Sequence, residues 1–462
     1  MKRWSAATLW TIVHIVSVLL VLCSPFVLLY DAAFRRDPEY DPSLTSHRLV
    51  DHSEQVAKLD RIAEELAFKY SVALEETKNT AQHRIIVFDC LTPRRCYGLG
   101  DRLRGISTLF YLSLLTSSSL FLNVQIPYPL LNFLTPTLYD WRINATVSYE
   151  GQVHGRACWW NDSTLAPTPL ARPVGAQLLG RKGTWRLRTW DNETQWWDWL
   201  TQWPQRLWRP DFEGFDAARE LSSKRMHRFI CNIGYPQAWV TNLHMRQAVL
   251  AYGLDKLQPE HLFSVSMRML FKPSPCIKAE IDEYIAMFPD WNDFRTLKIG
   301  VQIRTWITLD GWMKEYIRPP PWECYKKQLF ILMRDEVRRL ALSMNNTRSR
   351  DERRLRSRVI VFLTGDSQDA VDYLMATLVA EGIRVFRTDH DPSHILESST
   401  MDLAAKTYLD WWLLTKMDRL LITRSAFGET AAAYSLKPAV VIDGWVPECT
   451  TWQYNYTFHV DG

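Results

Sequence analysis

The last third of the chain alternates between short β-branched runs and helical segments, and this pattern constrains the fold more than any other feature. The predicted strands are 298–304, 358–363, 383–387, 419–423 and 439–443. The predicted helices between them are 322–339, 368–380, 402–416 and 428–435. Because parallel strands need a crossover connection, the alternation predicts an α/β fold with helices on both faces of a parallel sheet.

Polar residues follow several of these strands directly. Arg304 follows the first strand, Asp366 the second, and the segment 424–428 follows the fourth and opens a helix. Ligands of parallel sheets bind beyond the carboxyl ends of the strands. Arginine grips phosphate with two hydrogen bonds, and a helix start offers amides and partial positive charge. The joint placement predicts a nucleoside diphosphate site, although singly Arg304 also fits a surface ion pair and Asp366 or Ser425 a helix cap.

A second unit of this kind begins the folded body. A predicted strand at 84–89 leads through a glycine-containing loop at 97–105 into a predicted helix at 106–115, and 120–124 is the next predicted strand. The helix start can hold an anion. The glycine spacing matches neither the dinucleotide fingerprint nor the phosphate loop of nucleotide triphosphatases, and a plain turn needs glycine too.

Four segments, in this order, resemble a known family. Residues 98–116 resemble the Gly-Leu-Gly-Asn-Arg segment of plant xyloglucan fucosyltransferases and, more broadly, the α1,2-, α1,6- and protein O-fucosyltransferase superfamily. Residues 301–304, 362–366 and 410–431 are similar to its His-x-Arg, Ala-Thr-Asp and Ser-x-Phe-Gly motifs. The resemblance implies a GT-B fold, with two Rossmann-like domains facing a cleft. It also implies transfer from GDP-fucose with inversion and without a required metal.

The resemblance assigns roles to residues of this chain. Arg304 is expected to hold the diphosphate and assist its departure, Asp410 and Gln302 to hold guanine, and Asp366 to order the cleft. The remaining residues expected to bind the donor are Gly98, Gly100, Asp101, Arg102, Ser425, Phe427 and Gly428. The candidates for the catalytic base are Asp310 and Glu315, which also fit the description of solvated loop acids.

Three positions depart from the family pattern. Gln302 stands in place of the usual histidine, Gly365 in place of threonine, and Asp101 in place of asparagine. These departures keep two alternatives open: a GT-B transferase that uses another nucleotide sugar, and a non-catalytic homologue that binds glycans.

The N-terminus predicts a membrane anchor. Positions 4 to 30 carry no charge, and Lys2 and Arg3 precede them. The stretch is long enough to cross a bilayer, and the positive-inside rule leaves the N-terminus in the cytoplasm. A cleaved signal peptide is the alternative. We therefore expect a single-pass type II protein of the Golgi membrane whose catalytic body is luminal.

Glycosylation sequons and cysteines agree with a luminal body. Five sequons follow the anchor, at Asn144, Asn161, Asn192, Asn345 and Asn455. The cysteines beyond the anchor are Cys90, Cys96, Cys158, Cys231, Cys276, Cys324 and Cys449. Their number is odd, so at least one is a thiol or pairs between chains. Cys90 and Cys96 are close enough to bridge a loop, but spacing does not settle the connectivity.

The chain divides into four predicted segments: a tip and anchor (1–30), a stem (31–82), an N-terminal Rossmann-like, acceptor-side domain (83–290) and a C-terminal Rossmann-like, nucleotide-sugar-binding domain (291–462). Apolar spacing predicts a helix at 53–80, as a stem coiled coil or docked on the body. A tryptophan cluster at 185–208 predicts a helical insertion, since Trp196, Trp199 and Trp203 fall at helical spacing; a platform for sugar rings is the alternative.

Composition and charge restrict the partners. The net charge is +4, from 55 basic and 51 acidic residues, which is too even for an electrostatic nucleic-acid binder. No Cys-x-x-Cys spacing suggests zinc. The expected partners are a nucleotide-sugar donor, a glycan or glycoprotein acceptor and the membrane, and a homodimer is left open.

Overall fold

The computed structural model describes the body of the chain. The described residues are 52–80, 83–90, 97–124, 127–142, 147–153, 156–162, 177–181, 184–188, 194–199, 214–232, 234, 236–305, 321–343, 357–389, 400–444 and 447–454. The chain separates into two units, Met1–Val56 and Ala57–Gly462, and both sheets below belong to the second. The predicted anchor lies outside the described residues. Within them, no helix has the length and apolar character that crossing a membrane requires.

The C-terminal sheet confirms the predicted alternation. Its strands are β11 (Leu297–Ile303), β12 (Val359–Gly365), β13 (Arg384–Phe386), β14 (Arg419–Thr423), β15 (Ala439–Ile442) and β16 (Thr451–Gln453). Its helices are α11 (Trp322–Ser343), α13 (Gln368–Ala380), α14 (Met401–Thr415) and α15 (Ala426–Ser435). The strand order is β13-β12-β11-β14-β15-β16, parallel except for β16. Since the chain reverses its winding between β11 and β14, a ligand crevice is expected beyond their carboxyl ends.

Each face of this sheet is covered, which explains why its strands are apolar throughout. Alternate residues of β12 enter different cores: Ile360 and Phe362 join one, and Val359, Val361 and Leu363 the other. The latter core includes side chains of α11 and α13. The former includes α14 and α15 and continues beneath the N-terminal sheet. The two sheets are thus packed around shared apolar side chains.

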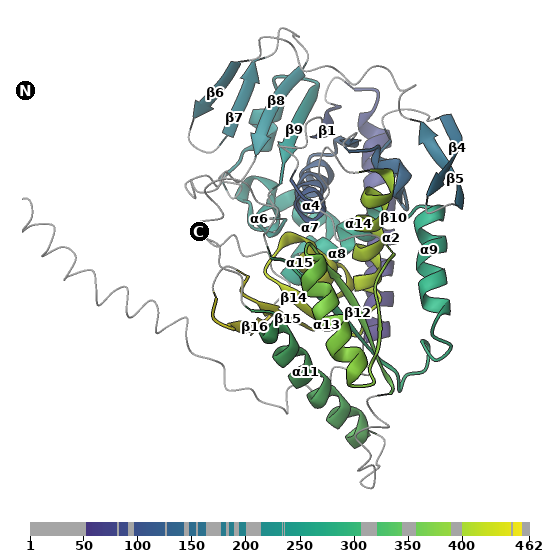
Figure 1. The fold of residues 1–462 in the computed structure, drawn as a ribbon. Coiled ribbons are helices and arrows are strands. Elements are labelled where there is room, and N and C mark those ends of the chain that lie inside the picture. Colours follow the sequence, from purple (N-terminus) through teal and green to yellow (C-terminus); the bar gives the residue numbers. More distant parts are fainter. Residues whose placement is uncertain are drawn as a thin grey trace, which may run out of the picture. The chain divides into compact units, whose positions relative to one another are not determined.

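The N-terminal sheet has the order β2-β1-β9-β8-β7-β6 (Figure 1). Its strands are β1 (Ile85–Cys90), β2 (Ser119–Val124), β6 (Gln177–Arg181), β7 (Thr184–Arg188), β8 (Thr194–Trp199) and β9 (Met226–Cys231). β2, β1, β9 and β8 are parallel, whereas β7 and β6 are antiparallel. The sheet therefore begins as the predicted strand–helix–strand unit and ends in a meander.

That meander corrects the prediction of a helical insertion at the tryptophan cluster. Trp197 is fully buried on β8; its indole Nε1 donates to His227 Nδ1 at 3.2 Å, and its ring stacks on Phe229 at 5.7 Å between centroids. Tryptophan favours strands, and the edge of β9 supplies partners that helical spacing does not reveal. Trp197 is a core residue. Trp190, Trp203 and Trp208 lie outside the described residues.

Shorter elements complete the N-terminal half, residues 83–290. They are η2 (Leu130–Asn132), β3 (Leu134–Thr135), β4 (Val147–Val153), β5 (Arg156–Asp162), α5 (Ala217–Leu221), α6 (Gln237–Thr241), η4 (Leu243–Met245), α7 (Arg246–Tyr252), η5 (Leu254–Lys256), α8 (Pro259–Leu270), β10 (Lys272–Pro273) and α9 (Pro275–Ala286). Of the predicted glycosylation sites, Asn161 lies on β5, where its side chain is not described, and Asn144, Asn192, Asn345 and Asn455 lie outside the described residues.

The predicted helix of the stem is α2 (His52–Thr77), and it is docked on the body. Leu59, Ala63, Leu66 and Tyr70 are all buried in the core that underlies the N-terminal sheet. The Tyr70 hydroxyl donates to the Ser118 carbonyl, and it also lies 3.1 Å from Ser113 Oγ. Of the two alternatives for this helix, packing against the body is the one that the structure shows.

Replacing Leu66 by Ala should destabilise the body. The side chain is 2% exposed, so its truncation leaves a cavity. We expect the free energy of unfolding to fall by about 2–5 kcal/mol. Phe68 on the same helix is 71% exposed, and Phe68→Ala should cost less than about 0.5 kcal/mol. Urea unfolding followed by tryptophan fluorescence compares the two variants. Equal stabilities would contradict docking of α2.

Candidate functional site

A cleft of about 700 Å³, counted with the part open to solvent, lies where the two halves meet. The N-terminal half contributes residues 98–101 at the start of α4 (Leu99–Leu115). The C-terminal half contributes the ends of β11 and β12, one side of α14 and the start of α15. The cleft thus opens at the carboxyl edge of the parallel sheet, at the reversal between β11 and β14.

Arg304, which follows β11, is the main cation of this cleft. Its Nη1 lies 2.8 Å from Asp366 Oδ2, and the two side chains are only 10% and 4% exposed. Thr305 donates to the other carboxylate oxygen through its amide (2.7 Å) and its hydroxyl (3.0 Å). Burial lowers the pKa of Arg304, while Asp366 and Asp101 act to raise it. Because arginine titrates so far above neutrality, the guanidinium stays charged.

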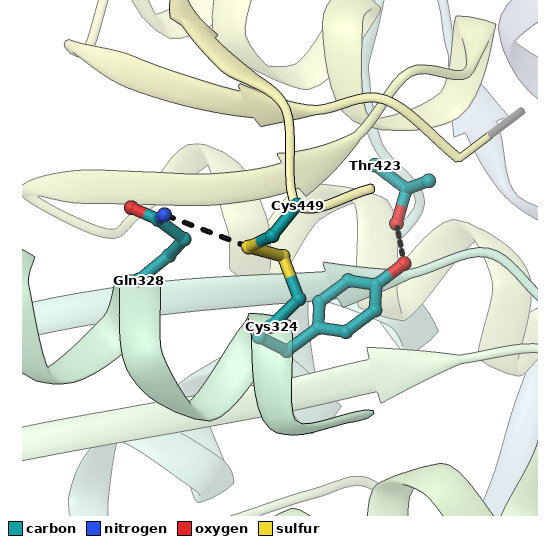
Figure 2. Close-up of a disulfide and its surroundings, with 5 residues drawn as sticks. Cys324, Gln328, Thr423 and Cys449 are labelled. Carbon is teal, nitrogen blue, oxygen red and sulfur yellow. Dashed lines mark hydrogen bonds between the residues drawn. A yellow bond between two sulfur atoms is a disulfide. The ribbon is translucent and has the colours of Figure 1, made fainter. Parts of the chain in front are cut away.

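A second layer of contacts fixes the backbone of Arg304. Its amide donates to Thr423 Oγ1 at 2.9 Å, and this hydroxyl also hydrogen-bonds Tyr325 Oη at 2.9 Å. Tyr325 directly follows Cys324 near the start of α11 (Trp322–Ser343), and Figure 2 shows the disulfide that joins Cys324 to Cys449. The disulfide joins the start of α11 to the segment that precedes β16, 125 residues later in the chain.

The other described cysteines differ in their bonding state. Cys90 and Cys276 are disulfide-bonded as well, to cysteines whose side chains are not described. Cys231 is a buried thiol. Cys96, the suggested partner of Cys90, lies outside the described residues, so that pairing stays a prediction.

The N-terminus of α15 faces the same cleft. Ser425 is its N-cap, but the Ser425 hydroxyl donates to Gln302 Oε1 at 3.2 Å and makes no hydrogen bond to its own helix. Ser425, Ala426 and Phe427 line the cleft, so the amides of the first turn are placed to bind an anion. Gly428 lies behind them, where an added Cβ would come within 2.8 Å of Gln302 Oε1.

The first turn of α4 closes the cleft from the other side. The sequence predicts a loop up to Gly105, but the helix already begins at Leu99, with Gly98 as its N-cap. A Cβ on Gly100 would lie 2.2 Å from the Ala426 carbonyl carbon and oxygen, so this glycine is required by the close approach of α4 to α15. Four residues on, Arg104 forms an ion pair with Glu429 of α15.

Of two neighbouring residues on α4, Asp101 lines the cleft and Arg102 does not. Asp101 lines the cleft, where burial raises the pKa of its carboxyl and Arg104 and Arg304 partly offset that rise. Arg102 is 2% exposed and is not part of the cleft lining. Its Nε donates to the Tyr97 carbonyl at 3.2 Å, and it also hydrogen-bonds Tyr408 of α14. Arg102 therefore supports the wall of the cleft from behind.

Asp410 of α14 is held by three donors of the chain. Thr364 Oγ1 donates to Oδ2 at 2.6 Å and Thr388 Oγ1 to Oδ1 at 2.6 Å, while the Lys406 ammonium pairs with Oδ2. Sequence reasoning missed Lys406, although a lysine four residues before an aspartate in an otherwise apolar helix is a visible signal. Lys406, Thr364 and Asp410 all line the cleft.

The structure thus brings most of the sequence-predicted residues into one cleft. The residues that line it are Gly98, Gly100, Asp101, Gln302, Arg304, Asp366, Asp410, Ser425 and Phe427. Arg102 and Gly428 stand behind this lining. The candidate bases Asp310 and Glu315 lie outside the described residues. In the part of the chain that is described, no three His, Cys, Asp or Glu side chains are grouped to hold a metal ion.

Comparison with known proteins finds solved fucosyltransferase structures that are similar to this chain at low sequence identity. No family model and no curated protein matches the chain. A mutant of Arabidopsis thaliana FUT1 in complex with GDP is similar at a TM-score of 0.48 and 12% identity, over 84% of this chain and 78% of that one. NodZ α-1,6-fucosyltransferase co-crystallised with GDP gives 0.38 and 13%, over 80% and 98%. Apo POFUT1 gives 0.36 and 11%, over 78% and 97%.

Gly100→Ala should separate α4 from α15. The added methyl would meet backbone atoms, which cannot rotate away as a side chain does. We therefore expect the free energy of unfolding to fall by at least roughly 1–3 kcal/mol, the usual cost of overpacking. Binding of inorganic pyrophosphate, measured by calorimetry, should weaken as well. Gly253→Ala is the control: its methyl meets nothing within 4 Å, and only its φ of +72° is strained. A Gly100→Ala variant that binds as the unaltered protein does would refute the contact.

Asp101→Asn should change how stability depends on pH. Because burial raises the pKa of Asp101, the unfolded chain ionises first, and stability is lost as pH rises from the ordinary carboxyl range through the raised pKa. Asparagine removes this loss, so the stability of the variant relative to the unaltered protein should increase with pH. Urea unfolding across pH 3.5 to 7 measures the difference. Asp255→Asn, at an exposed site, is the control, and parallel curves for Asp101→Asn would contradict the prediction.

Proposed function

We propose that this protein is an inverting glycosyltransferase that transfers a sugar, fucose from GDP-fucose, to a hydroxyl of a glycan or glycoprotein. The observation that carries the proposal is the Arg304–Asp366 pair beside the uncapped amides of α15, in one cleft at the reversal of a parallel sheet. This arrangement offers a fixed cation and amide donors where a diphosphate would lie.

The proposed reaction exchanges one carbon–oxygen bond for another. The acceptor oxygen attacks the anomeric carbon, and the bond from that carbon to the β-phosphate breaks with its electron pair going to the diphosphate. Arg304 and the first amides of α15 stabilise the negative charge that develops there. Since Asp366 and Thr423 hold the guanidinium and its backbone, little reorganisation is needed during the step. Arg304 and these amides thereby stabilise the negative charge of the leaving diphosphate without a metal ion.

The acceptor proton must go to a base on the face opposite the leaving group. Asp310 and Glu315 remain the predicted candidates for this role. The acceptor would approach from the N-terminal half, which meets the C-terminal half across the cleft. We propose that this pairing of two Rossmann-like halves is a GT-B arrangement.

The choice of GDP-fucose rests on the resemblance of the four motifs, not on the shape of the cleft. The glutamine at position 302, where the family has histidine, keeps another nucleotide sugar in consideration. Its Oε1 accepts from Ser425, so its amide group is the part that would donate to a ligand. A screen of GDP-fucose, GDP-mannose and UDP-sugars, each with and without a glycan mixture, decides between donors. A homologue that only binds glycans would release no nucleotide from any of them.

The proposed compartment is the Golgi lumen, with the chain held by a type II anchor at its N-terminus. Support comes from the uncharged stretch at positions 4 to 30 after Lys2 and Arg3, and from the five sequons. The disulfide between Cys324 and Cys449 is also typical of an oxidising compartment.

Removing the arginine charge should strongly reduce the rate of transfer. Arg304→Ala alone would leave the Asp366 charge buried and without its partner, so we choose the double variant Arg304→Gln with Asp366→Asn. Release of GDP from GDP-fucose should fall by roughly 10²–10³-fold, the usual effect of losing one such electrostatic contact.

The matched control is a buried ion pair at the opposite edge of the same sheet. Arg419 Nε lies 2.7 Å from Glu336 Oε1, with exposures of 9% and 4%, and Arg419→Gln with Glu336→Gln should keep turnover. Circular dichroism establishes that both double variants are folded. Near-normal turnover in the Arg304 variant would overturn its assignment.

A further inference from the structure

Among the described residues that line the cleft, three carry carboxylates, and the chain itself already supplies donors to two of them. Asp366 pairs with Arg304 and accepts two hydrogen bonds from Thr305. Asp410 accepts from two threonine hydroxyls and pairs with the ammonium of Lys406. A carboxylate offers about four acceptor positions, and donors of the chain take about three on each of these two. Neither has much room for a further donor from a substrate.

Asp101 is the third carboxylate, and its partners differ. The backbone amide of Gly98 donates to it, and in the part of the chain that the structure describes no side chain forms an ion pair or a hydrogen bond with it. The amide contact resembles one half of a capping box at the start of α4. Asparagine, which the resembled family has at this position, could make the same contact through its amide oxygen. Capping alone therefore does not call for a charge here.

Asp101 reaches the cleft from the half that does not carry Arg304. It lies on α4, and a Cβ added to its neighbour Gly100 would come within 2.2 Å of the Ala426 carbonyl at the start of α15. Since consecutive Cα atoms are about 3.8 Å apart, Asp101 lies close to the amides proposed to bind the diphosphate. Inversion requires a base on the face of the sugar opposite the leaving group. A carboxylate from the other half of the cleft is suited to that face.

The charges around Asp101 affect its strength as a base. Burial is the largest cause and raises the pKa of its carboxyl, and Glu429 on α15 acts in the same direction. Arg104 on α4, the Gly98 amide and Arg304 after β11 act to lower it. A general base works best when its pKa lies near the working pH, so the net rise makes Asp101 a better proton acceptor than an ordinary aspartate.

We propose that Asp101 is the general base that accepts the proton of the acceptor hydroxyl. This inference rests on the proposed function and takes the role for which Asp310 and Glu315 are the candidates predicted from the sequence. As the acceptor oxygen bonds to the anomeric carbon, its proton passes to the Asp101 carboxylate. The bond from that carbon to the diphosphate oxygen breaks, and its electron pair stays on the diphosphate. The carboxyl returns its proton to water once the products have left.

The first experiment compares Asp101→Asn with the unaltered full-length protein. Release of GDP from GDP-fucose in the presence of a glycan mixture should fall by roughly 10²- to 10⁴-fold, the usual contribution of a general base. Binding of GDP, measured by calorimetry, should stay the same or tighten, because the variant removes a negative charge from an anion site. The matched control is Asp369→Asn, an exposed acid in the first turn of α13, which should change neither quantity.

Azide gives a readout that a merely structural role would not change. Azide is a nucleophile with no proton to lose, so its attack on the anomeric carbon needs no base. Sodium azide should therefore restore release of GDP from GDP-fucose in Asp101→Asn, with fucosyl azide as the product detected by mass spectrometry. Asp310→Asn and Glu315→Gln should keep transfer to the glycan mixture and gain nothing from azide.

The pH dependence tests the same carboxyl in a second way. The base must be ionised, so transfer by the unaltered protein should be lost as pH falls through the raised pKa of Asp101. Glu429→Gln removes a charge that raises this pKa, and it should move the loss of transfer to lower pH. Circular dichroism establishes that each variant is folded.

Each outcome bears on a stated claim. Near-normal transfer to glycans in Asp101→Asn would overturn the inference, and so would a loss of GDP binding as large as the loss of transfer, which would make Asp101 a donor ligand. Azide rescue in Asp310→Asn or Glu315→Gln instead would move the role to that residue. If the unaltered protein released no GDP from GDP-fucose with any glycan, the proposed function itself would fail, and the inference with it.

Discussion

A guanidinium buried at the edge of a sheet is tolerated only when its charge is matched, and in this protein Asp366 matches that of Arg304. The surrounding contacts serve the same pair. Thr305 orients the carboxylate, Thr423 holds the arginine amide, and Tyr325 positions Thr423 beside a disulfide. A cation fixed in this way faces its ligand without first having to be ordered. The C-terminal sheet therefore positions Arg304 in addition to forming a hydrophobic core.

The cleft exists because α4 approaches α15 closely enough for backbone atoms to meet. Gly100 allows that approach, and the ion pair of Arg104 with Glu429 holds the two helices together. The approach also buries Asp101, the carboxyl that burial makes harder to ionise. The N-terminal half thus closes one side of the cleft, while α14 supplies polar groups to its lining.

Much of the C-terminal half could be predicted because its signals are local. Each parallel strand is a continuous apolar run, and Arg304 and Asp366 stand directly after two of them. The tryptophan cluster was mispredicted as helical because β8 forms by pairing with β9, whose sequence lies about thirty residues away. The glycine-containing segment at 98–105 was mispredicted as loop because glycine ordinarily weakens a helix, whereas here it permits packing of α4.

The sequence by itself determined which elements form and which side chains end the central strands, since both follow from local apolar pattern and chain order. Only the tertiary structure decided that Thr364 and Thr388 donate to the Asp410 carboxylate, that Arg102 turns behind the cleft and that α2 belongs to the body. These outcomes depend on which side chains from distant segments share a buried space, because burial forces each charge to find a partner there. Tertiary packing decides which of these side chains become neighbours, and the order of residues along the chain does not reveal it.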